Sequence, residues 1–134
     1  MTIAQDRLDE LWDFGDAAAS EARLRAAADA ASGADADELQ TQVARALGLQ
    51  GRFAAADAVL DALDPDASPT VRVRADLERG RLRNSAGEPD AAVPLFERAA
   101  EAAASARLFF LEVDALHMLA IADRDHADAW TDRA

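Results

Sequence analysis

Apolar side chains recur along this chain at the three- and four-residue spacing of amphipathic helices. Leu39, Val43, Ala46 and Leu47, for example, share one face of a helix predicted over residues 38–50. No segment sustains the strict alternation of apolar and polar residues that is typical of a strand. The pattern therefore predicts an all-α chain of seven or eight antiparallel helices.

Polar residues and prolines indicate where these helices begin. Asp35 to Asp37 are expected to cap the helix that follows them, and Ser105 the helix over 106–122. Ser68 and Pro69 are expected to open the third long helix, because proline is tolerated in a first helical turn. Pro94 falls inside the next helix, where it should bend the helix or delay its start.

Three glycines, Gly15, Gly51 and Gly87, are spaced 36 residues apart and set the register of an internal repeat. We expect each glycine to end a helix in the left-handed conformation. Residues of similar size recur at fixed distances from the glycines. These are Leu8, Ala44 and Gly80 seven residues before, Ser20, Ala56 and Ala92 five after, and Leu24, Leu60 and Phe96 nine after.

Two stretches carry a recognisable motif. Residues 44–65 (ARALGLQGRFAAADAVLDALDP) combine small residues, Leu-Gly, Gly-x-aromatic, Ala, Leu and a terminal Asp-Pro, and residues 80–100 follow the same order more loosely. In this respect the chain resembles the tetratricopeptide repeat family. The resemblance implies a right-handed superhelical solenoid of about four antiparallel helix pairs. The pairs would cover approximately residues 2–32, 36–65, 69–104 and 106–134 of a single domain, 1–134.

An ordinary bundle of alanine-rich helices remains the alternative to a repeat, because alanine supplies 36 of the 134 residues. Chance matches at small-residue positions are therefore easy. The agreement of the large residues in the same register favours the repeat.

Charge and composition exclude several classes of protein. The formal net charge is −12, which argues against binding to nucleic acid or to an anionic membrane surface. No cysteine is present, so disulfides, thiolate nucleophiles and cysteine metal sites are excluded. We found no signal peptide and no apolar run long enough to span a membrane, and we expect a cytoplasmic protein.

The sequence offers little catalytic chemistry. Its two histidines, His117 and His126, are placed on different helices, and His117 is expected to be a packed core residue within an apolar stretch. Neither a metal-binding nor a phosphate-binding motif is found. We therefore expect no enzyme activity, no cofactor and no metal.

The basic residues suggest a binding groove. Five of the 14 arginines lie between Arg72 and Arg83 on one predicted helix. In the family that the chain resembles, the inner helices line a concave groove that binds a peptide or a helix of a partner protein. The resemblance places these residues in the groove: Arg45, Arg74, Leu77, Arg81, Asn84, Phe109, Glu112 and Leu116.

The arginines and Asn84 would then hold acidic or backbone groups of the partner, and the apolar residues would add contact area. The alternative is that the arginines pair with Asp76, Glu78 and acids on adjacent helices. The groove hypothesis makes the chain a protein–protein interaction module, an adaptor or scaffold. A ligand-sensing module that binds a small anion at the arginine face is a further possibility.

The last long helix is hydrophobic nearly all round, from Leu108 to Ile121. The chain ends without a polar capping helix, which predicts either a longer array or pairing with another copy. For a homodimer, self-association would use Phe109, Phe110, Met118 and Trp130. Alternatively, these side chains simply fill the junction between the third and fourth helix pairs.

Overall fold

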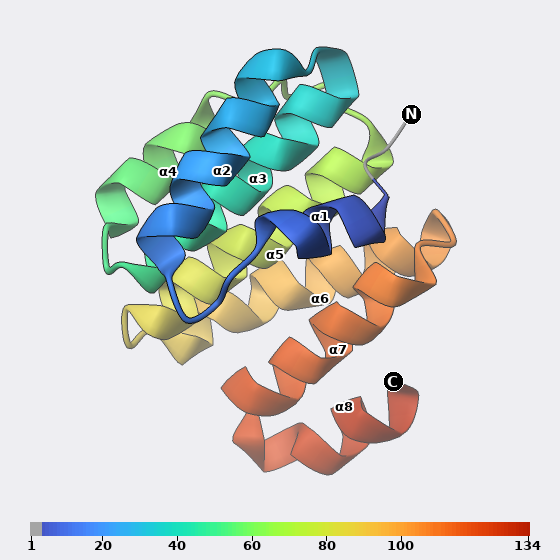
Figure 1. Cartoon of the computed structure of the whole chain (residues 1–134). Coiled ribbons are helices and arrows are strands. Elements are labelled where there is room, and N and C mark those ends of the chain that lie inside the picture. The colour runs from blue at the N-terminus through green and yellow to red at the C-terminus, as the bar shows by residue number, and fades with distance from the viewer. Residues whose placement is uncertain (1–3) are drawn as a thin grey trace. The chain divides into compact units, whose positions relative to one another are not determined.

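The computed structural model describes residues 4–134 and is built from helices (Figure 1). Within these residues there are eight α-helices and one short 3-10 helix, and there is no strand, which confirms the all-α prediction. The chain divides into two compact units, the first ending at Val71 and the second running from Arg72 to Ala134. The start of the first predicted pair, residues 2 and 3, lies outside the described residues.

The first unit contains four helices. They are α1 (Gln5–Leu11), α2 (Ala17–Ala30), α3 (Gly33–Leu49) and α4 (Phe53–Asp61). Helix α3 packs against both α2 and α4. It buries Leu39, Val43 and Leu47 at the predicted helical spacing, while α2 contributes Leu24 and α4 contributes Leu60 to the buried core.

The second unit is built from the remaining helices. They are α5 (Pro69–Ser85), whose first turn precedes the boundary, α6 (Pro89–Ser105), α7 (Phe109–Ala122), the 3-10 helix η1 (Arg124–His126) and α8 (Ala127–Arg133). Phe96 of α6 is fully buried at the centre of this unit. Val73 and Leu77 of α5 and Leu116 and Leu119 of α7 belong to the same hydrophobic cluster.

Gly80 lets α5 approach the ring of Phe96 closely. A Cβ atom at position 80 would lie 2.7 Å from Cδ1 and 2.8 Å from Cζ of that ring, which is closer than van der Waals contact allows. The absence of a side chain at Gly80 thus creates the space that the largest core residue of the unit occupies.

The predicted left-handed glycine turns are confirmed at two of the three positions. Gly51 and Gly87 have φ values of 74° and 81° at the ends of α3 and α5. Gly15 is not in this conformation, so that prediction was wrong. There the chain turns through side-chain bonds instead: the Asp13 carboxylate accepts from the Gly15 N–H at 3.0 Å, and the Asp16 carboxylate caps α2 by accepting from the Ala19 N–H.

Several predicted helix ends need correction. Helix α3 begins at Gly33, so Asp35 lies within its first turn and is not the cap. Ser105 is the last residue of α6 and does not cap α7. Helix α6 starts at Pro89 and continues through Pro94, so its start is not delayed. The opening of α5 at Pro69 is confirmed, with the Val71 N–H donating to Ser68 Oγ at 3.4 Å.

The residues in register with the three glycines share a common environment. All nine are buried: Leu8, Ala44, Gly80, Ser20, Ala56, Ala92, Leu24, Leu60 and Phe96. The small members leave room for neighbouring helices and the large members fill the cores. The right-handed solenoid and the tetratricopeptide-like arrangement stay predictions.

Candidate interaction surface on helix α7

Arg81, predicted to bind a partner, is held by carboxylates of its own unit. It forms an ion pair with Glu78 one turn earlier on α5, and both of its bonds to the Asp114 carboxylate of α7 measure 2.7 Å. The Arg81 side chain is 15% exposed and that of Glu78 only 1%. The alternative of pairing with acids on the same and neighbouring helices is therefore the one observed for Arg81.

In this cluster the single positive charge of Arg81 lies between the two carboxylates of Glu78 and Asp114. Burial lowers the pKa of Arg81, but the carboxylates of Glu78 and Asp114 outweigh that effect and raise its pKa overall. The second oxygen of Glu78, Oε1, is buried and has no hydrogen-bond partner among the described residues. Arg81 thus serves to neutralise a buried acid, and its guanidinium is not available to fork onto a ligand.

The apolar members of the predicted groove are mostly inaccessible. Leu77 and Leu116 each expose only 1% of their surface and lie in the core of the second unit, so a partner cannot contact them. Arg74 is likewise buried. Asn84 and Glu112 are half-buried. Among the predicted groove residues of the second unit, only Phe109 is largely exposed.

Arg45 contacts aromatic rings in the first unit. The rings of Trp12 and Phe14 stack with their centroids 4.5 Å apart, and the Arg45 guanidinium lies 4.9 Å from the Phe14 centroid and 5.5 Å from that of Trp12. The Trp12 indole also donates to Gln42 Oε1 at 3.1 Å. These contacts hold Arg45 against the α1–α2 loop.

The most exposed apolar surface of the second unit lies along α7. Phe109 and Phe110 each expose 63% of their surface, Val113 exposes 48% and Ile121 41%. With the exposed His117 they fall on one arc of about 120°, at the roughly 100° that each helical residue turns. We call these five residues the α7 stripe.

The opposite face of α7 accounts for the rest of its hydrophobic character. Leu111, Ala115 and Leu119 are buried there in the core that α6 and α7 share. The expectation of a packed core histidine was wrong, because His117 lies on the exposed arc. Val113 and Ile121 were also not identified from the sequence as exposed site residues. Each lies two positions after a buried leucine, Leu111 or Leu119, and two positions in a helix correspond to a turn of about 200°, onto the opposite face.

Met118 and Trp130, two residues predicted for self-association, are instead packed internally. Both are partly buried against the core of the second unit. The Trp130 indole donates to the Asp123 carboxylate at 3.0 Å, and the Arg133 guanidinium lies 5.2 Å from its ring. For these two side chains the alternative of filling an internal junction holds, whereas Phe109 and Phe110 remain exposed.

His126 takes part in the same local network. Its Nδ1 lies 3.1 Å from the carboxylate of Asp123. The hydrogen bond and the charge of Asp123 raise the pKa of His126. Hydrogen bonds from Trp130 and His126 lower the pKa of Asp123. Asp123 thereby ties η1 and α8 to the end of α7.

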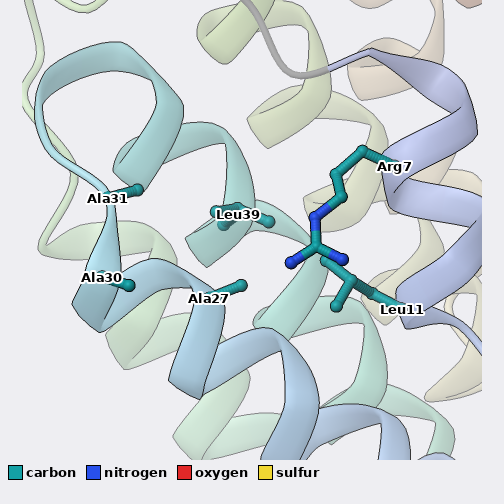
Figure 2. A pocket seen from close by; sticks show the side chains of 6 residues that line it. All are labelled: Arg7, Leu11, Ala27, Ala30, Ala31 and Leu39. Atoms are coloured by element: carbon teal, nitrogen blue, oxygen red, sulfur yellow. The ribbon is translucent and has the colours of Figure 1, made fainter.

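A pocket of about 170 Å³ lies in the first unit (Figure 2). Leu11 and Leu39 contribute apolar walls, α2 and its C-terminal cap contribute Ala27, Ala30 and Ala31, and the Arg7 side chain reaches toward Leu39 and Leu11. Arg7 also pairs with Glu10 at 3.5 Å. The lining offers one charged group and no acid, base or nucleophile beside it, so the pocket has room for a small apolar molecule but no groups for chemistry.

The described part of the chain offers neither a membrane-spanning helix nor a cluster of metal ligands. No helix there is both long enough and apolar enough to cross a membrane. No three histidine, aspartate or glutamate side chains in residues 4–134 are grouped so that they could hold a metal ion.

Comparison with known proteins does not assign the chain to a family, because it matches no protein-family model, no curated protein and no solved structure. The resemblance to tetratricopeptide repeats therefore stays a prediction from its motifs.

Proposed function

We propose that this chain is a protein–protein interaction module that binds its partner through the α7 stripe. The observation that carries the proposal is the exposure of Phe109, Phe110, Val113 and Ile121 on one face of a helix whose opposite face buries Leu111, Ala115 and Leu119. Single exposed apolar residues are ordinary on protein surfaces, but a contiguous row along one helix is typical of a binding site.

This proposal changes the surface that the sequence suggested and keeps the class of function. The groove hypothesis needed Leu77 and Leu116 at the surface and Arg81 free for a ligand. Leu77 and Leu116 are core residues, and Arg81 is paired with Glu78 and Asp114. The α7 stripe supplies the exposed aromatic anchors that interfaces favour.

Site-specific photocross-linking tests the proposal directly. A photoreactive phenylalanine analogue would replace Phe110 in the full chain, and cells expressing it would be irradiated. We expect covalent protein adducts at position 110, because a bound partner would cover this side chain. The matched control carries the analogue at Leu49 of α3, a leucine of the first unit that is 55% exposed.

A second variant tests whether the adduct at position 110 depends on the rest of the α7 stripe. Adding Val113→Asp to the Phe110 probe should abolish the adduct, because a carboxylate would be buried at the centre of the contact. Adducts of equal yield at Leu49 and Phe110, or none at Phe110, would contradict the proposal.

A further inference from the structure

The α7 stripe is nearly symmetric about Ala115 in its own sequence. Phe109 and Ile121 lie six residues either side of Ala115, and Val113 and His117 two residues either side. A second α7 helix running antiparallel along the first would thus place Phe109 against Ile121 of the other copy, and Val113 against His117. Such self-complementarity is what a two-fold interface requires.

Charges at the two ends of the stripe favour the same arrangement. Arg107, just before α7, is exposed and forms no ion pair among the described residues. Asp125, just after α7, is also exposed. An antiparallel pair brings each Arg107 to the C-terminal end of the other helix, where the helix dipole is negative, whereas a parallel pair would bring the two Arg107 side chains together.

The second unit is also the less charged part of the chain. Residues 72–134 contain nine arginines and 12 acidic residues, a formal charge of −3. Residues 1–71 contain five arginines and 14 acidic residues, a formal charge of −9. A contact between two second units therefore joins surfaces of formal charge −3, which repel each other less than two first units would.

From these observations we infer that the partner of the α7 stripe is a second copy of this chain, bound antiparallel with the two-fold axis at the level of Ala115. The inference rests on the proposed function and names its partner. The stripe exposes about 400 Å² of apolar surface per copy, so a pair would bury about 800 Å² of it. That area is small for a stable dimer and predicts a weak, concentration-dependent pair.

Sedimentation velocity over a concentration series measures the association. The wild-type chain is expected to be half dimeric at about 100 µM, as such a small interface implies. Phe110→Asp should raise that midpoint at least about tenfold, because it puts a charge into the contact. The matched control is Leu49→Asp, which makes the same kind of change at an exposed leucine of the first unit and should leave the midpoint unchanged.

Disulfide trapping tests the orientation, and the natural chain has no cysteine to interfere. A mixture of Val113→Cys and His117→Cys chains should form the mixed disulfide under mild oxidation, since these positions face each other across the antiparallel pair. Ile121→Cys alone should form little disulfide dimer. A parallel pair would give the reverse result and would overturn the proposed geometry.

The outcomes separate this inference from the proposed function. A wild-type chain that stays monomeric at about 1 mM overturns the self-association, whatever the cross-linking shows. If the Phe110 probe then yields an adduct with a different protein, the interaction module stands and only its partner was wrongly inferred. If neither dimer nor adduct forms, both proposals fail.

Discussion

Arg107 occupies a backbone conformation that the chain otherwise gives to glycine in the same motif. Its φ is 59°, and it follows α6 as Gly51 follows α3 and Gly87 follows α5. At all three ends the last turn is closed by the same pair of backbone bonds; after α6, the Leu108 N–H donates to the Ala103 carbonyl and the Arg107 N–H to the Ala104 carbonyl. Two of the three turns therefore use the residue that suits the conformation, and the third does not.

Replacing Arg107 by glycine should stabilise the protein. The left-handed conformation costs a residue with a Cβ about 1–2 kcal/mol, and the larger entropy of glycine in the unfolded chain returns part of this. We expect a gain of about 1 kcal/mol in the free energy of unfolding, measured by urea denaturation. Gly87→Ala is the converse control and should lose a similar amount; a loss of stability in Arg107→Gly would contradict this reading.

At Gly80, in contrast to Arg107, the glycine is required by packing against the Phe96 ring and not by its backbone conformation. Gly80→Ala should lower the free energy of unfolding by about 1–3 kcal/mol through overpacking, although alanine is the better helix former by about 1 kcal/mol. The double variant with Phe96→Leu checks the cause. If the Phe96 ring is responsible, Gly80→Ala should cost clearly less in the Phe96→Leu background than in the wild type.

At the scale of the elements, the charged residues fall into two classes that differ in burial. The Arg81 cluster is largely buried, whereas the pair of Arg98 and Asp76 leaves the arginine side chain 63% exposed. Arg81→Met would leave the Glu78 carboxylate buried without its counter-ion, and it should destabilise the protein by about 2–4 kcal/mol. Arg98→Met should cost less than about 1 kcal/mol. Equal effects in urea denaturation would contradict the structural role of Arg81.

The attachment of α8 should depend on pH through His126 and Asp123. The raised pKa of His126 means that its contribution is complete below the unfolded value of 6.5 and is lost as the pH rises through the higher folded value. The lowered pKa of Asp123 means that its contribution is present above the unfolded value of 3.8 and is lost as the pH falls through the lower folded value. Attachment should therefore be strongest between these two unfolded values.

Fluorescence of Trp130, which donates to Asp123, reports on this attachment in a Trp12→Phe background. We expect its emission to move toward that of exposed tryptophan as the pH rises above the window. His126→Gln is the control and should remove the change on the alkaline side. An unchanged alkaline transition in that variant would assign the effect to another group.

The sequence was informative about the existence of helices and less so about their ends. Residues such as Leu39, Val43 and Leu47 repeat at helical spacing, and that period alone predicts α3 and its buried face. The start of α3 at Gly33 and the end of α6 at Ser105 were missed, because Asp35 and Ser105 are good caps by residue type yet lie inside helices here. Cap preferences are small energies that the packing of a whole helix outweighs.

The candidate site could be predicted only in part. Phe109 and Phe110 stood out as large apolar residues, but a helix that is hydrophobic all round does not reveal which side is covered. That choice depends on contacts between α7 and α6, which no single-helix pattern contains. Leu77 and Arg81 were wrongly placed in a groove for the same reason, since the helical face that carries them is the one that α6 and α7 cover.

At the scale of the whole molecule, the two units differ in what they offer a partner. The first has the larger negative charge and a small pocket that Arg7 helps to line. The second is closer to neutral and exposes the α7 stripe. Association driven by apolar contact is therefore expected at the second unit, while the charge of the first keeps the chains from clustering there.

Self-association through the α7 stripe can be followed in amide NMR spectra of the wild-type chain over a dilution series from about 1 mM to about 20 µM, which spans the weak affinity expected for so small an interface. We expect concentration-dependent shifts confined to the exposed face of α7 and its flanks, at Phe109, Phe110, Val113, His117 and Ile121. Shifts centred on Arg45, Arg74 and Asn84, or spectra that do not change, would contradict the proposed contact.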